Sequence, residues 1–200
     1  MPDEKLSSRE EGFAVINAMI SKARNQFTEN GHLYLLWGWV ILICSVGHFI
    51  MQSIAQIKYY SFIWLLTLPA TVYQLLYLRR KIKKSRVRNY ADEIMGYVWL
   101  VFFISTALLV VLLTDHFTNP GYQTIIWLIM YGMPTFLSGA IIRYKGLMAG
   151  AVCCWLLAIA SAFIPVQYHM LLLAVAVVCG WIIPGYGMQQ RFNKQNAIAI

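Results

Sequence analysis

Charged residues are scarce in this chain of 200 residues. Asp, Glu, Lys and Arg make up 12% of it, whereas hydrophobic residues make up 60%. A soluble domain usually carries about 25% charged residues, so this chain lacks the polar surface that a soluble globular protein needs. The composition excludes a sizeable soluble domain and favours an integral membrane protein.

The residue types that carry catalysis are missing from the apolar parts of the chain. No Asp, Glu, Lys or Arg occurs between Lys145 and Arg191, and the sequence contains no H-E-x-x-H motif and no glycine-rich phosphate loop. The chain contains four cysteines: Cys44, Cys153, Cys154 and Cys179. They form no C-x-x-C pair and lie within apolar stretches, which favours small buried hydrophobic side chains. The sequence therefore predicts no enzyme activity, no metal site and no cofactor.

Six apolar stretches are each close to the roughly 20 residues that a helix needs to cross a ~30 Å hydrocarbon core. They lie at about residues 33–52, 59–78, 94–114, 122–142, 146–164 and 169–188. The sequence thus predicts an all-α membrane protein in which residues 33–188 form a six-span domain. The spans also group as three hairpins, at 33–78, 94–142 and 146–188. The similarity among the hairpins reflects either a loose internal repeat or chance.

The basic residues fall on alternate sides of these stretches. Of the 16 Lys and Arg residues, all but Lys58 lie in the N-terminal tail, the 79–93 connection, the 143–145 turn or the C-terminal tail. Cytoplasmic loops keep an excess of Lys and Arg, because positive charge resists translocation. The pattern predicts that both termini, a 1–32 tail and a 189–200 tail, lie in the cytoplasm.

A dense run of positive charge follows the second apolar stretch. Its members are Arg79, Arg80, Lys81, Lys83, Lys84, Arg86 and Arg88. Anionic lipid head groups at the cytoplasmic face are the expected partners, and an acidic protein is the alternative. The run has no interleaved aromatic residues, which argues against nucleic-acid binding.

The N-terminal tail contains an amphipathic pattern over residues 8–30. Ser8 and Glu11 form a capping box, and the apolar residues that follow recur on one face of a helix until Asn30-Gly31. Such a helix before a first span is expected to lie flat on the membrane surface. The alternative is a docking or dimerisation helix, because the same spacing suits a partner groove.

Each even-numbered stretch contains a proline: Pro69, Pro134 or Pro184. Proline within a helix frees the carbonyl four residues earlier, as occurs in ordinary packed bundles and at the substrate sites of secondary transporters. Polar side chains that could line such a site are Tyr73 and Gln74 on the second stretch and Tyr131, Thr135 and Ser138 on the fourth. Residues Gly146 to Gly150 form a small-xxx-small pattern that is typical of a close helix contact.

Four short strings carry a resemblance. They are Tyr34-Leu35-Leu36-Trp37-Gly38-Trp39, Tyr131-Gly132-Met133-Pro134-Thr135-Phe136-Leu137-Ser138-Gly139, Cys153-Cys154-Trp155 and Trp181-Ile182-Ile183-Pro184-Gly185-Tyr186. Together they resemble small uncharacterised multi-span bacterial inner-membrane proteins, over about residues 15–190. The resemblance implies a location in the bacterial inner membrane and brings no known activity or site residues.

Two functions remain open. The absence of buried charge, of catalytic motifs and of an extramembrane domain favours a non-enzymatic membrane subunit, scaffold or regulator that acts through lipid contacts or protein contacts, including a homo-oligomer. The alternative is a small-molecule transporter, or a membrane subunit of one, with a cavity at the proline-broken fourth and sixth stretches.

Overall fold

The computed structural model describes residues 31–84, 90–115 and 120–198, and every regular element in these ranges is helical. The elements are α2 (Gly31–Phe49), η1 (Ile50–Ile54), η2 (Tyr60–Leu66), α3 (Thr67–Lys84), α4 (Tyr90–Asp115), α5 (Pro120–Ile142), α6 (Lys145–Ser161), η3 (Val166–Tyr168), α7 (His169–Val177), η4 (Val178–Ile182) and α8 (Ile183–Ile198). The predicted all-α class is confirmed for these ranges. The amphipathic segment 8–30, Arg86 and Arg88 lie outside the described residues, as do the side chains of Lys81, Lys83 and Lys84.

Five helical stretches are long and apolar enough to cross a membrane. They are Gly31–Ile54, Tyr60–Arg80, Glu93–Val111, Tyr122–Ile142 and Val166–Lys194. They coincide with the first, second, third, fourth and sixth predicted spans. The predicted fifth span corresponds to α6, which is apolar but has only 17 residues.

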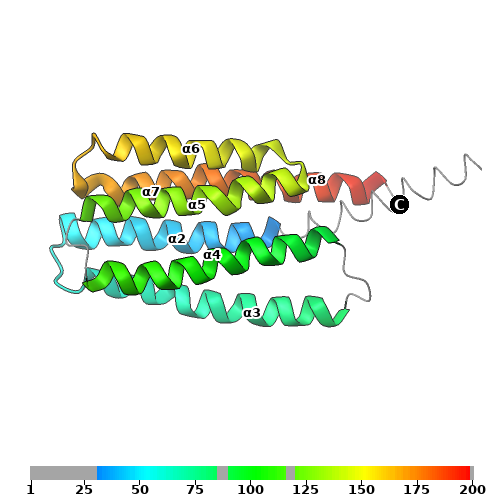
Figure 1. Cartoon of the computed structure of the whole chain (residues 1–200), viewed down its shortest axis with the longest axis horizontal. Coiled ribbons are helices and arrows are strands. Elements are labelled where there is room, and N and C mark those ends of the chain that lie inside the picture. Colours follow the sequence, from blue (N-terminus) through cyan, green and yellow to red (C-terminus); the bar gives the residue numbers. More distant parts are fainter. Residues whose placement is uncertain (1–30, 85–89, 116–119, 199–200) are drawn as a thin grey trace, which may run out of the picture.

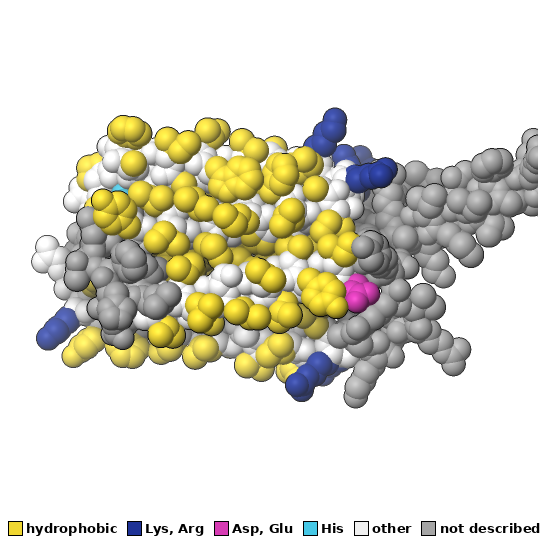
Figure 2. All heavy atoms as spheres, in the orientation of Figure 1, with side chains coloured by type: hydrophobic (Ala, Val, Ile, Leu, Met, Phe, Trp, Pro, Cys, Tyr) yellow, Lys and Arg dark blue, Asp and Glu magenta, His cyan; other side chains and the backbone are white. Residues whose placement is uncertain are grey.

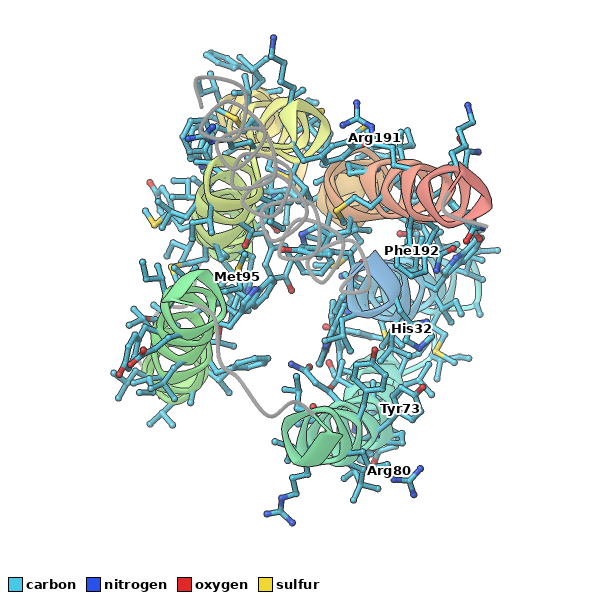
Figure 3. The ribbon with its side chains drawn as sticks, turned by 90° about the vertical axis from the view of Figure 1, so that its right-hand side faces the viewer. His32, Tyr73, Arg80, Met95, Arg191 and Phe192 are labelled. Carbon is cyan, nitrogen blue, oxygen red and sulfur yellow. The ribbon has the colours of Figure 1, made fainter. Side chains whose placement is uncertain are left out.

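The helices lie side by side along one common axis (Figure 1). α2 packs on α7, η4 and α8, and α5 packs most extensively on α6, a helix of a different predicted hairpin. α3 packs mainly on α2, and α4 packs mainly on α5, so α3 and α4 form the two margins of the bundle (Figure 3). Accordingly, 11% of the apolar window is buried in the second and third stretches, against 39–50% in the other three.

Two of the three prolines adjoin a change in helix type. Before Pro184, η4 is a π-helix, in which the Ile183 N–H donates to the Val178 carbonyl five residues earlier. Before Pro69, η2 is a 3-10 helix, and the Thr67 hydroxyl donates to the Trp64 carbonyl at 2.7 Å. Helix irregularities of this kind are common where a proline interrupts the regular bonding of a helix.

Positive charge gathers at one end of the bundle (Figure 2). This basic end comprises the described cations at the end of α3, at the α5–α6 turn and in α8: Arg79, Arg80, Arg143, Lys145, Arg191 and Lys194. Lys58 lies in the η1–η2 connection at the opposite end (Figure 1). The uneven distribution of charge that the sequence shows is therefore also a spatial one.

Candidate functional site

A hydrogen bond between α5 and η4 lies at the centre of the candidate site. Thr135, directly after Pro134, is 0% exposed, and its hydroxyl donates to the Tyr131 carbonyl at 2.7 Å. The same oxygen accepts the indole N–H of Trp181 at 2.8 Å. Trp181 is 4% exposed, so neither partner has ready access to solvent. The polar group beside the proline is thus satisfied inside the protein.

Ser138 makes a second contact on the same face of α5, because it follows Thr135 by three residues. It is 0% exposed, and its hydroxyl donates to the Met95 sulfur of α4 at 3.2 Å. In Figure 3, Met95 lies on the side of α4 that faces α5. Ser138 therefore links α5 to α4.

Aromatic side chains surround this polar face. The Tyr131 ring lies 5.0 Å from the Trp181 ring and 6.0 Å from the Phe102 ring. Tyr34 meets Trp99 edge to face, with ring centroids 5.9 Å apart. The structure therefore brings the predicted trio of Tyr131, Thr135 and Ser138 together, and it packs them among rings from α2, α4 and η4.

Tyr73 and Gln74 of α3 form a separate group. The Tyr73 hydroxyl lies 3.1 Å from His32 Nε2, and Trp37 donates its indole N–H to the Gln74 side-chain oxygen. Both partners belong to α2, and Figure 3 shows His32 and Tyr73 between the two helices. Tyr73 is 45% exposed, whereas Thr135 and Ser138 are fully buried and Tyr131 is partly buried. The five predicted residues thus occupy two places, on α3 and on α5.

The basic end contains a strained turn between α5 and α6. Arg143 has a φ of 56°, its N–H donates to the Ala140 carbonyl, and the next N–H, of Tyr144, donates to the Gly139 carbonyl at 2.8 Å. These bonds match a Schellman motif, in which glycine usually occupies the position of Arg143. The Arg191 guanidinium lies 4.8 Å above the Tyr144 ring, so a cation of α8 contacts the tyrosine of this turn.

Two described histidines have buried or half-buried rings, and each ring lies within hydrogen-bond distance of groups in the protein. His48 Nδ1 accepts the Trp64 indole N–H at 3.0 Å. His169 Nε2 lies 3.0 Å from the carbonyl of Ser161, the last residue of α6, and 3.0 Å from that of Ile164. Within the part of the chain that the structure describes, no group of three or more His, Cys, Asp or Glu side chains could hold a metal ion.

Sequence reasoning missed the partners of the predicted residues. Trp181 and Met95 are the hydrogen-bond partners of the α5 cluster, and Tyr144 is the ring that Arg191 contacts at the basic end. Their pairing depends on how distant helices pack, which hydropathy along the chain does not report. The tryptophans were the one sequence feature that indicated such partners, because a buried indole N–H requires a nearby hydrogen-bond acceptor.

Comparison with known proteins adds no family to this picture. No family model, no curated protein and no solved structure matches this chain. Its function must therefore be inferred from its own residues.

Proposed function

We propose that this chain crosses the bacterial inner membrane six times, with both termini in the cytoplasm. We further propose that it acts as a non-enzymatic membrane subunit, scaffold or regulator through protein or lipid contacts. The observation that carries the proposal is the closed polar face of α5. Thr135 and Ser138 are fully buried and bonded to Tyr131, Trp181 and Met95.

A transport site at the fourth and sixth spans needs polar groups that face a hydrated cavity. Thr135 uses its hydroxyl as both donor and acceptor within the protein, and the Ser138 hydroxyl donates to the thioether of Met95. In a membrane, hydroxyls bonded across helices stabilise helix association. The geometry of this face supports a packing role.

The basic end supports the lipid part of the proposal. Among the described side chains only Glu93 is a carboxylate, and it accepts the Tyr97 hydroxyl at 3.2 Å. Arg143 is exposed and holds a left-handed conformation that costs a non-glycine residue about 1–2 kcal/mol. Attraction to lipid would offset this cost, because each cation at a cytoplasmic interface gains about 1 kcal/mol of binding free energy from anionic lipids.

The alternative function is a small-molecule transporter or a membrane subunit of one. A different part of the bundle, around α3 and α4, supports it. α3 and α4 lie at the margins of the bundle and do not pack extensively on each other. Tyr73 and Gln74 on α3 are polar and only partly covered. A transport path would therefore run beside α3 and not along the buried face of α5.

Thiol labelling separates the two functions. In a chain whose four native cysteines are replaced by alanine, a cysteine is introduced at one site: Ser138→Cys, Thr135→Cys or Tyr73→Cys. Opened membrane vesicles, which expose both faces, are treated with a membrane-impermeant maleimide. Lys194→Cys, at an exposed position near the end of α8, is the positive control.

The packing role predicts that positions 135 and 138 stay unlabelled while position 194 reacts fully. Labelling at 135 or 138 that a small solute blocks would overturn the proposal. Labelling restricted to position 73, and blocked by a solute, would favour transport beside α3. No reaction at 73, 135 or 138 supports the packing role.

A further inference from the structure

The connection between α6 and α7 has an apolar surface. It lies at the end of the bundle opposite the basic end (Figure 1). Phe163 is 84% exposed, the highest exposed fraction of any large hydrophobic side chain in the described part of the chain, and Val166 is exposed as well. An exposed apolar surface usually marks contact with a membrane or with another protein. The connection therefore needs an apolar partner.

The exposed apolar surface continues along α6. Leu156 and Ile159 are both exposed, and together with Phe163 they follow one another at intervals of three and four residues. This spacing places them on one face of a helix. The face runs from the middle of a helix that we propose to span the membrane into the connection. This continuity favours lipid over a protein as the partner of Phe163.

The length of α6 sets the depth of the connection. α6 begins at Lys145, an exposed cation of the basic end, and ends at Ser161 after 17 residues. Its length is about 25 Å at 1.5 Å per residue, whereas the hydrocarbon core is ~30 Å thick. Because the charge of Lys145 is costly to bury, it keeps that end at the head groups. α6 therefore ends before it reaches the head groups of the other leaflet.

His169 supplies hydrogen bonds to the backbone at this end of α6. Its Nε2 lies 3.0 Å from the Ser161 carbonyl and 3.0 Å from the Ile164 carbonyl. Carbonyl oxygens only accept, so Nε2 carries the proton and donates to both. His169 and Ser161 are each 2% exposed. The N–H groups of Ala162 and Phe163 donate to carbonyls three residues earlier. These bonds are of the kind that backbone at membrane depth requires.

We propose that the α6–α7 connection is inserted into the bilayer and binds phospholipid of the leaflet at this end, with Phe163 and Val166 among the acyl chains. His169 is a positioning residue, because its hydrogen bonds replace the water that an ordinary helix end would bind. The proposal rests on the six-span arrangement proposed above and adds to it the depth of this connection and its lipid partner.

The test measures the depth of a fluorescent label on the full chain in phospholipid vesicles. In the chain whose four native cysteines are replaced by alanine, Phe163→Cys, Leu156→Cys or Lys194→Cys is labelled with bimane. Phospholipids with brominated acyl chains quench a label inside the bilayer, and iodide on both sides of the vesicles quenches a label in water. We expect strong quenching by brominated lipid and several-fold weaker quenching by iodide at positions 163 and 156, and the reverse at position 194.

The control positions separate this proposal from the six-span arrangement. If iodide quenches position 163 as strongly as position 194 while position 156 stays in lipid, the proposal is overturned and the spanning of α6 stands. A bilayer that thins to the length of α6 would give this result. Iodide quenching at both 156 and 163 would overturn the six-span arrangement as well. A label at 163 that neither reagent quenches would show a protein contact and would also overturn the proposal.

Variants of His169 test its positioning role through the label at position 163. His169→Leu removes the donor, so the two carbonyls need water, and we expect iodide quenching at 163 to rise several-fold. Position 156 should stay in lipid in the same background, which shows that α6 remains inserted. His169→Gln keeps an N–H donor and should leave position 163 in lipid. Unchanged quenching at 163 in His169→Leu, or equal exposure to iodide in both variants, would overturn the role of His169.

Discussion

Trp181 donates its indole N–H to the hydroxyl of Thr135 at 2.8 Å, and this bond joins two proline-containing stretches. Thr135 follows Pro134 in α5, and Trp181 lies in the π-helix three residues before Pro184. Both side chains are buried, so a lost partner would not be replaced by water without a structural change. The bond therefore couples the proline-containing part of α5 to the π-helix that precedes Pro184.

Replacing the threonine hydroxyl by a methyl group tests this coupling. Thr135→Val keeps the shape of the side chain but leaves the Trp181 N–H without its acceptor. We expect the free energy of unfolding to fall by about 1–3 kcal/mol, the cost of a buried unsatisfied polar group. Thr135→Ser keeps the hydroxyl and should lose less. Thermal unfolding followed by circular dichroism in detergent gives the comparison.

A double-mutant cycle identifies the partner. Trp181→Phe removes the donor, so Thr135→Val should cost less in that background than in the natural chain. Residues in direct contact usually show interaction energies of about 0.5–3 kcal/mol. Strictly additive losses would mean that the two side chains do not act as a pair.

The glycine contact between α6 and η4 yields a second prediction. A Cβ at Gly150 would meet backbone atoms of Cys179 and Gly180 at 2.6 Å, and backbone cannot rotate away. Gly150→Ala should therefore destabilise the bundle by about 1–3 kcal/mol, as overpacking does. Gly96→Ala in α4 is the matched control, because a Cβ there meets nothing within 4 Å. Removing glycine from an exposed helix should raise stability by up to about 1 kcal/mol.

The outcome is measured as the shift in the thermal unfolding midpoint of each variant. A loss at Gly150 with a neutral or positive shift at Gly96 supports the close crossing. Equal shifts in the two variants would contradict it, because helix propensity alone would then account for both.

The sequence alone predicts where the long apolar helices lie, but it does not predict which helices contact one another. Hydropathy along the chain located the five long stretches, since roughly 20 apolar residues are a property of one segment. Packing in a membrane depends instead on small residues and specific hydrogen bonds between segments. Gly150 was part of a predicted contact pattern, but its partner Gly180 was not identifiable.

The candidate site shows the same division. Helical spacing correctly placed Tyr131, Thr135 and Ser138 on one face of α5, because residues three and four apart are neighbours. Spacing does not tell whether that face borders water or another helix. Only the packing of α5 against Trp181 and Met95 shows what the hydroxyls meet.

The third prediction concerns membrane topology. A reporter that is active only in the cytoplasm is fused after Lys194, within residues 79–93, or within residues 115–121. Lys and Arg are retained on the cytoplasmic side, so the reporter should be active at the first two sites, which lie at the basic end. The reporter should be silent at the third site. Activity within 115–121 would contradict the six-span arrangement.

The last prediction tests the strained turn at the basic end. Arg143 occupies a left-handed position with a φ of 56°, where glycine has no steric penalty. Arg143→Gly should raise the free energy of unfolding by about 1 kcal/mol through relief of this strain. Arg143→Ala is the matched control, because it removes the same charge and keeps the Cβ. Both variants are measured in nanodiscs of neutral lipid.

Adding anionic lipid then separates the role of the charge from that of the backbone. Arg143 and Lys145 flank Tyr144 in the sequence and Arg191 contacts its ring, so each should contribute to head-group binding at this end. We expect anionic lipid to stabilise the natural chain more than either variant, and to stabilise the glycine and alanine variants by equal amounts. If anionic lipid stabilises all three chains equally, Arg143 makes no lipid contact. If glycine and alanine are equally stable in neutral lipid, the left-handed conformation carries no cost.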